Sequence, residues 1–305
     1  MKVKKSVAKS GQAVSEGVAL ANEIKPEQSQ ELLKELHILT REGKLNQDSR
    51  RKLKQVYHLY HFIEKILVEL SLPDKSGLAA DPGALTLADH GAGKSYLGFI
   101  IYDLFFKGRA TGHIYGIETR TDLVEKSRDL AQRLGFERMS FLNLSVTESA
   151  LSADLPIRID VVTALHACDS ATDDAIAFGL RKKARFMVLV PCCQAEVARA
   201  LGQNRVLALA RTPLAELWRH PLHAREMGSQ LTNVLRCLYL EASGYQVTVT
   251  ELVGWEHSMK NELIIAQYTG HRKPNAVERL RSVLEQFGLL DLLASRFVLG
   301  NNPTQ

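Results

Sequence analysis

Two carboxylates flank a glycine-rich turn in the first half of the chain. Asp89 closes the apolar run 85–89, Gly91 and Gly93 follow it, and Glu118 lies 25 residues beyond Gly93. Glycines have no Cβ, so they let the backbone and the first amides of a following helix approach a ligand closely. A carboxylate about 20 residues beyond such a turn is the usual acceptor for the ribose hydroxyls of a nucleoside cofactor. The spacing therefore predicts a site for S-adenosylmethionine (SAM), a methyl donor, in contact with Asp89, Gly91, Gly93 and Glu118.

Two other interpretations of the turn remain open. Ala88, followed by four residues and then Gly93, Lys94 and Ser95, matches the loose form of a phosphate-binding loop, with alanine in place of the first glycine. Asp89 disfavours that interpretation, because a carboxylate inside the loop would repel a triphosphate. The third interpretation is a glycine turn with a purely structural role.

The candidate catalytic residues follow two later apolar runs, 160–165 and 186–190. They are His166, Cys168 and Asp169 after the first run, and Cys192 and Cys193 after the second. Ligand sites of open α/β sheets lie at the carboxyl ends of the strands. We therefore expect these side chains to form the active site.

Several chemical roles fit these residues. His166 titrates near neutral pH and suits a general base, although a histidine that shapes the pocket fits equally. A thiolate of Cys192 or Cys193 could add to a pyrimidine ring, as in C5 methyltransferases, or both cysteines could be packing residues. The four cysteines lack the paired C-x₂-C spacing of a structural zinc site, so no metal is predicted. The run 160–165 is also not followed by the Asn/Asp-Pro-Pro-aromatic tetrapeptide that is usual for methylation of exocyclic amines.

Two further residues complete the predicted cofactor site. Asn143, near the end of the apolar run 139–144, is expected near the adenine, and a turn residue after a strand is an equally good interpretation. Leu165 ends the run that leads to His166 and is expected beside the cofactor.

Alternating strands and helices must position these residues. The predicted strands are 85–89, 113–118, 139–144, 160–165, 186–190, 245–254 and 262–268. The predicted helices among them are 96–107, 122–134, 171–181 and 232–243, and one more follows at 276–293. This alternation implies a mostly parallel sheet, and the last two strands form a hairpin. We therefore predict an α/β fold: a Rossmann-like class I methyltransferase sheet of seven strands with a helical N-terminal extension.

Charge is concentrated in the N-terminal part of the chain. We predict a disordered basic tail (1–24), a helical cap (25–78), a SAM-dependent methyltransferase domain (79–270), and a C-terminal helix and tail (271–305). The cap is expected to hold helices at 27–39 and from Asp48 or Ser49 to about Ser71. Residues 1–60 contain twelve Lys and Arg against seven acidic residues, which equals the whole net charge of +5. A basic appendage on a neutral domain predicts a polyanion partner, here RNA, and a solvated basic face is the alternative.

Composition also indicates a compartment. Four cysteines without the spacing of a disulfide scaffold favour a reducing environment, and no apolar run approaches the ~20 residues that cross a bilayer. The N-terminus lacks the apolar region of a signal peptide. We expect a soluble, cytoplasmic protein without a membrane partner.

Three longer motifs carry a family resemblance. They are LHACDSATDDAIAFGL at 165–180, VLVPCCQ at 188–194 and EHSMKNELIIAQ at 256–267. Together they resemble a class I SAM-dependent methyltransferase family with an LHAC motif after the fourth strand and a Pro-Cys-Cys motif after the fifth. Its members include methyltransferase-like proteins related to ribosomal-adenine-dimethylase-domain-containing proteins and a tRNA ribose 2′-O-methyltransferase.

The resemblance covers about residues 80–270 and implies both site and function. It implies SAM binding at Asp89, Gly91, Gly93 and Glu118, and an active-site wall of His166, Cys168, Asp169, Pro191, Cys192 and Cys193. Ser95 stands where a third glycine is common, and Gln194 where Tyr or His often follows the cysteines. The expected function is SAM-dependent methylation of rRNA or tRNA. The alternatives are methylation of a protein or small molecule, and a methyltransferase-like binding module without turnover.

Overall fold

A seven-stranded sheet forms the centre of the computed structural model, which describes residues 24–72, 85–165, 170–191, 195–203, 213–252 and 262–298. The strands lie in the order β3-β2-β1-β4-β5-β7-β6. Their bounds are β1 Thr86–His90, β2 His113–Glu118, β3 Met139–Asn143, β4 Val161–Leu165, β5 Phe186–Val190, β6 Tyr245–Glu251 and β7 Glu262–Tyr268. The strands β1 to β5 pair in parallel, and β7 pairs antiparallel with both β5 and β6. The predicted Rossmann-like class I methyltransferase sheet is confirmed.

The composition of the strands follows from their place in the sheet. Strands β4 and β5 are covered on both faces, and their sequences VVTAL and FMVLV are almost wholly apolar. The edge strand β6 has the mixed sequence YQVTVTE and exposes several of its side chains. Strands β1 and β4 also contain three buried polar residues, which are Asp89, His90 and Thr163. Burial in an apolar core does not explain polar side chains at these positions.

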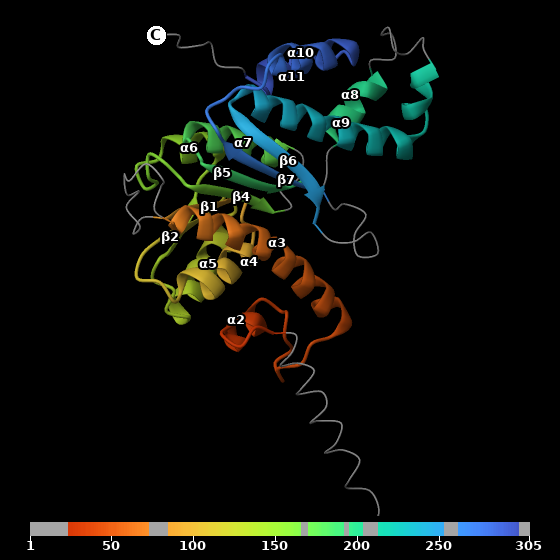
Figure 1. The fold of residues 1–305 in the computed structure, drawn as a ribbon. Helices are drawn as coiled ribbons and strands as arrows, with labels where there is room; N and C mark the ends of the chain where they lie inside the picture. Colours follow the sequence, from red (N-terminus) through yellow and green to blue (C-terminus); the bar gives the residue numbers. More distant parts are fainter. Residues whose placement is uncertain are drawn as a thin grey trace, which may run out of the picture.

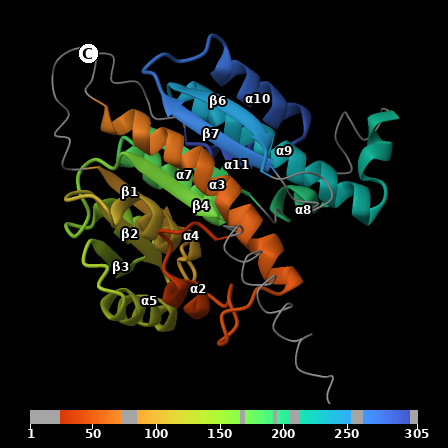
Figure 2. The same cartoon turned by 60° about the horizontal axis from the view of Figure 1, so that its bottom comes forward.

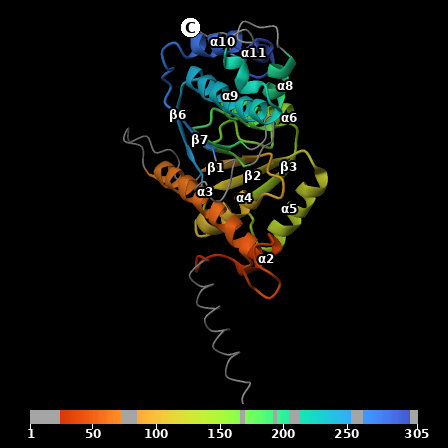
Figure 3. The same ribbon diagram turned by 90° about the vertical axis from the view of Figure 1, so that its right-hand side faces the viewer.

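Helices cover both faces of the sheet (Figure 1). One layer holds α2 Gln30–Glu35, α3 Gln47–Ser71, α4 Tyr96–Ile101, the π-helical turn η1 Tyr102–Phe106, and α5 Thr121–Arg133. The other layer holds α6 Val146–Leu151, α7 Ser170–Arg181, α8 Glu196–Gln203, η3 Pro213–Trp218, α9 Pro221–Ala242, α10 Ala276–Gln286 and α11 Asp291–Ser295. Figure 2 shows α3 lying across the first layer, and Figure 3 shows α3 and α9 on opposite sides of the sheet. None of the helices described here combines the length and apolarity that a bilayer-spanning segment requires.

Each helical layer closes its own core against the sheet. Leu87 and Val161 face the first layer, whereas the next residues, Ala88 and Val162, face the second. This alternation is the two-residue period of extended strands. It places Asp89 on the side of α4 and His90 on the side of α7.

The N-terminal helices share the first core. Leu32 and Leu33 of α2 are fully buried in the same cluster as Leu87 of β1 and Phe99 of α4. Removal of this segment would therefore expose the first core of the sheet itself.

Several element boundaries differ from the sequence-based prediction. The helix α2 is shorter than 27–39 because His37 adopts a left-handed conformation (φ 55°). Asn46, and not Asp48 or Ser49, caps α3 by accepting the Ser49 amide hydrogen. The predicted helix 276–293 is two helices, because Gly288 (φ 64°) ends α10.

The helix after the glycine turn changes its hydrogen-bond pattern halfway. A single helix was expected over 96–107, but α4 gives way to the π turn η1. The carboxylate of Asp103 in η1 is buried; it accepts the Ser29 amide hydrogen at 2.7 Å and pairs with the Lys107 ammonium at 3.0 Å. Spacing of apolar residues does not distinguish π from α turns, so the sequence pattern could not predict this segment. Asp103 thereby links the N-terminal helices to the helix that follows the glycine turn.

We predict that Asp103→Ala lowers the free energy of unfolding by about 1–3 kcal/mol, because the partly buried Ser29 amide loses a charged acceptor. The matched variant Lys107→Met should lower it by less than about 1 kcal/mol, since the Lys107 side chain is 48% exposed. Urea unfolding followed by circular dichroism measures both values. Equal losses in the two variants would mean that the ion pair, and not the link to Ser29, is what stabilises this segment.

Candidate functional site

The glycine turn lies between β1 and α4 at the carboxyl end of the sheet. Gly91 (φ 68°) and Gly93 (φ 58°) both adopt left-handed conformations, which cost a residue with a Cβ roughly 1–2 kcal/mol. Between them, the Ala92 amide donates to the carbonyl of Ile117 in β2 at 3.0 Å. The turn is thus fastened to the neighbouring strand, beside Glu118.

Glu118 closes on this turn from the end of β2. One carboxylate oxygen accepts the Gly93 amide hydrogen at 2.8 Å, and the other accepts the amides of Thr119 and Arg120 at 3.0 and 3.1 Å. The Arg120 guanidinium also donates to both oxygens, at 3.1 and 3.3 Å. Although burial opposes ionisation, hydrogen bonds from Arg120 and Gly93 and the Arg120 charge hold the pKa of Glu118 below its usual value. Glu118 is therefore an ionised acceptor at the turn.

Asp89 links the strand before the turn to β4 and to α4. Its side chain is buried, accepts the Thr163 hydroxyl hydrogen at 2.8 Å, and accepts the Gly98 amide of α4. Burial, together with a smaller effect of the nearby Glu118 charge, raises its pKa to about 6 against the opposing effect of these hydrogen bonds. The absence of a side chain at Gly98 leaves room for the Ser95 hydroxyl, because a Cβ at Gly98 would lie 2.6 Å from Ser95 Oγ.

The other two predicted cofactor residues have different environments. The Asn143 amide donates to the carbonyls of Glu118 and Thr119 at 3.1 and 2.8 Å, and its carbonyl accepts the Thr121 hydroxyl hydrogen. Asn143 thus fixes the backbone that carries Glu118. Leu165 is half-buried at the end of β4.

The geometry disagrees with a phosphate-binding loop. Ser95, whose hydroxyl would face a metal–triphosphate, is 1% exposed and points inward. The Gly93 amide, which would face a phosphate, is bonded to the Glu118 carboxylate. A triphosphate would meet two carboxylates, Asp89 and Glu118, at close range.

Two buried polar side chains at the turn have no hydrogen-bond partner. They are Ser95, at its hydroxyl, and His90, at both ring nitrogens. His90 packs against Phe178 of α7, with ring centroids 5.3 Å apart, and burial lowers its pKa to about 4. The turn itself offers bare glycine backbone beside the ionised carboxylate of Glu118, so the residues present fit the predicted cofactor.

The predicted catalytic residues lie outside the described residues. These are His166, Cys168, Asp169, Cys192 and Cys193, in the gaps 166–169 and 192–194. The ends of both gaps are described: Leu165 ends β4, and Pro191 is buried directly after β5. Both gaps therefore open at the carboxyl edge that carries the glycine turn.

A buried polar network fixes the elements around these gaps. Arg236 of α9 is fully buried and donates to the Asp173 carboxylate in the first turn of α7, at 2.6 and 3.2 Å. Arg236 also donates to Asn233, whose amide donates to Glu262 at the start of β7 at 2.6 Å. The network ties α7, which follows the gap 166–169, to β7, which follows the gap 253–261. Apolar periodicity did not predict these four residues; the available signal was a charged residue within the apolar run LRCLYL of α9.

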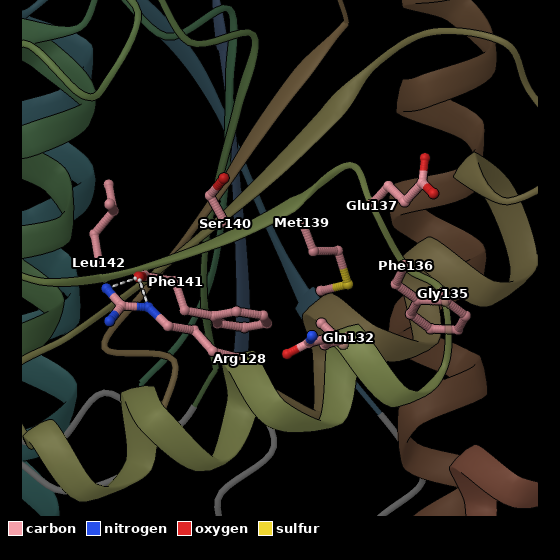
Figure 4. Close-up of a pocket in the computed structure, with 10 residues that line it drawn as sticks. Arg128, Gln132, Gly135, Phe136, Glu137, Met139, Ser140, Phe141 and Leu142 are labelled. Carbon is pink, nitrogen blue, oxygen red and sulfur yellow. Dashed lines mark hydrogen bonds between the residues drawn. The ribbon is translucent and has the colours of Figure 1, made fainter.

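Two surface hollows lie near α5. The larger, about 580 Å³, runs between α5 and the edge strand β3, and none of the predicted site residues lines it (Figure 4). There Arg128 donates to the outward carbonyl of Phe141 at 2.9 and 2.6 Å, which protects the sheet edge. The smaller hollow, about 320 Å³, lies between α2 and α5 and includes Lys94 and Tyr96, next to the glycine turn.

The two titrating groups on β1 predict opposite pH dependences. Asp89 has its folded pKa raised from 3.8 to about 6, so folding binds a proton and stability falls as pH rises through that window. His90 has its folded pKa lowered from 6.5 to about 4, so folding releases a proton and stability rises with pH. Each contribution amounts to roughly 3 kcal/mol, and in the wild type they largely cancel.

As pH rises from 4 to 6, the free energy of unfolding of Asp89→Asn should therefore increase relative to wild type. As pH rises from 4 to 6.5, that of His90→Phe should decrease relative to wild type. Urea unfolding at several pH values measures the two differences. Parallel changes in the two variants would contradict opposite burial shifts on the two faces of β1.

A family model described as a methyltransferase domain matches residues 51–200. A search of curated protein sequences found no significant match.

Similar solved structures include three methyltransferases. Precorrin-6y C5,15-methyltransferase from Geobacter metallireducens is 17% identical, with 68% of this chain and 87% of that chain covered and a TM-score of 0.38. An rRNA methylase from Streptococcus thermophilus is 10% identical, with 68% and 95% covered and a TM-score of 0.39. Magnesium protoporphyrin IX methyltransferase from Synechocystis, solved with bound S-adenosylhomocysteine, is 11% identical, with 85% and 99% covered and a TM-score of 0.42.

The domain match and the strand order give the same assignment, and the carboxylates at the glycine turn suit its cofactor. The match over residues 51–200 indicates that this chain carries a methyltransferase domain, for which SAM is the methyl donor.

Proposed function

We propose that SAM binds across the glycine turn, with its ribose hydroxyls on the Glu118 carboxylate. The observation that carries this proposal is the hydrogen bond between Glu118 and the Gly93 amide, which brings an ionised acceptor to the side-chain-free bend. Gly91 and Gly93 line the bend, and Leu165 lies at the end of β4, on the same edge. Asp89 and Asn143 act as positioning residues, because each holds backbone or a helix next to the turn.

The active-site wall is assigned to His166, Cys168, Asp169, Cys192 and Cys193. When bound, SAM supplies an activated methyl group for direct displacement, so the chain must align a nucleophile and accept its proton. His166 is the assigned base. The network of Arg236, Asp173 and Glu262 holds the elements that flank this wall.

RNA is the proposed substrate, and rRNA or tRNA the class within it. The support is the excess of basic residues over residues 1–60, together with the LHAC and Pro-Cys-Cys motifs and the subfamily that they resemble. The cysteine usage further supports a cytoplasmic setting.

Cofactor affinity tests the role of Glu118. Glu118→Gln should weaken SAM binding about tenfold or more, because a charged acceptor for hydroxyl hydrogens is lost. Arg120→Ala should instead leave the affinity unchanged or tighten it up to about fivefold, since Arg120 is 63% exposed and competes for the same oxygens. Titration calorimetry with SAM and S-adenosylhomocysteine gives both values, and unchanged thermal midpoints exclude misfolding. If Glu118→Gln binds SAM with wild-type affinity, the proposed contact between Glu118 and the ribose is wrong.

Transfer of label from tritiated SAM tests the substrate. We expect incorporation into total RNA, and not into protein, from a strain that lacks the enzyme. Glu118→Gln is the matched control and should transfer little at limiting SAM. Label in protein or in small molecules would show that RNA is not the substrate. SAM binding without any transfer would identify a binding module.

A further inference from the structure

The solvent face of α3 carries cations along much of its length. At 3.6 residues per turn, six exposed side chains fall within about 100° of one another, opposite the buried face of the helix. They are Arg50, Arg51, Lys54, His58, His61 and Lys65. We refer to these six residues as the α3 basic stripe.

The positions of the cations in the α3 basic stripe destabilise the helix. Arg50, Arg51 and Lys54 lie in the first two turns, where the helix dipole disfavours cations. Arg50 and Lys54 are four residues apart, so their like charges repel. The ion pair between Arg51 and Asp48 offsets little of this cost, because the two groups are 3.9 Å apart and both are exposed. Beside its acidic neighbours Asp48 and Glu64, the second of which lies 3.8 Å from His61, the stripe keeps an excess of positive charge, and this excess points to a polyanion that neutralises it.

Two imidazoles interrupt the cations in the middle of the stripe. His58 lies edge-on to Phe62 with ring centroids 5.1 Å apart, which holds one ring in place on the exposed face. Imidazole rings stack on unpaired bases, whereas bases inside a duplex already stack on each other and have no free face for such a ring. The alternation of cations and rings therefore favours a single-stranded segment over a duplex.

The stripe leads toward the methyl-transfer edge. The N-terminal end of α3 lies on the side of the molecule on which β4 ends (Figures 1 and 2). Near its middle, α3 is joined to η1 through the Tyr60 hydroxyl, which donates to the Leu104 carbonyl at 3.3 Å. The helix that follows the glycine turn thus packs directly beneath the stripe.

On the basis of the RNA methylation proposed above, we propose that the α3 basic stripe binds a single-stranded segment of RNA and leads it to the carboxyl edge of the sheet. The phosphates lie on Arg50, Arg51, Lys54 and Lys65, and bases stack on His58 and His61. From Arg50 to Lys65 the stripe spans about 22 Å; Arg50 and Lys54 are about 6 Å apart along the helix, and Lys54 and Lys65 are about 16 Å apart, with the two imidazoles between them.

Charge removal on the stripe provides the test. The stripe variant is Arg50→Gln/Lys54→Gln/Lys65→Gln, and the control is Arg272→Gln/Lys273→Gln/Arg281→Gln, exposed residues in and just before α10 in the opposite layer. Both lose three charges, so their net charges match. The probe is a fluorescent single-stranded RNA of mixed sequence, roughly 20 nucleotides long, titrated at several salt concentrations.

We expect the stripe variant to bind at least about tenfold more weakly, with its salt slope reduced by about 2, because each lost phosphate contact contributes about 0.7. The control should retain wild-type affinity and slope. His58→Ala/His61→Ala should weaken binding without changing the slope. Thermal unfolding of the free stripe variant should occur at the same or a higher temperature, since glutamine keeps helix propensity and removes repulsion.

Different outcomes separate this inference from the proposed function. If the stripe variant binds RNA like wild type while tritiated methyl transfer into RNA continues, the stripe is overturned and RNA methylation stands. If wild type neither binds nor methylates RNA, the proposed substrate is wrong. Tighter binding of the matching duplex, or binding of phosphatidylserine vesicles in place of RNA, would also overturn the single-strand assignment.

Discussion

The hydrogen bond between the Gly93 amide and the Glu118 carboxylate is the constraint on which the candidate site depends. It joins a turn after β1 to the end of β2, so it requires that the two strands end level with each other. The parallel register meets this requirement, with His90 opposite Ile117. That register is held in turn by two cores, one on each face, whose residues alternate along β1. The geometry of the candidate site is therefore a consequence of ordinary strand alternation together with two glycines that tolerate left-handed backbone.

The end of β1 concentrates groups that burial disfavours. Asp89 and His90 are consecutive, face opposite layers, and have pKa values displaced in opposite directions by burial. The protein keeps both although apolar residues would pack there at lower cost. Displaced pKa values and unpartnered polar atoms collect at functional sites more than elsewhere in a fold. Their concentration on one strand end agrees with the assignment that the glycines and Glu118 give independently.

The features that short stretches of sequence determine could be predicted, whereas contacts between distant segments could not. Apolar runs gave the seven strands to within a few residues, and the carboxylate spacing predicted that Asp89 and Glu118 lie at one turn, where the structure has them. The partners that complete the site come from distant segments: Thr163 on Asp89, Arg236 on Asp173, and Ser29 on Asp103. Such pairs depend on which elements the tertiary fold brings together, and no periodicity records them. Asn143 shows the same limit, because its position was predicted but its bonds to the backbone of β2 were not. The roles of His166 and the cysteines remain predictions, since they lie outside the described residues.

The N-terminal helices combine two functions that are often separated into modules. Leu32, Leu33 and Leu53 belong to the first core of the sheet, so deletion of residues 1–60 would unfold the domain along with removing its charge. A loss of RNA binding after such a deletion would then report on stability and not on recognition. The cations sit on the opposite face of α3 and contribute nothing to that core, so they can be neutralised without loss of packing. Because α3 and η1 share the contact between Tyr60 and Leu104, a strand of RNA bound on α3 would press on the helix that follows the donor turn. If the two proposals hold, substrate and cofactor are bound on two faces of one packed layer, and this gives a physical reason for cations on α3.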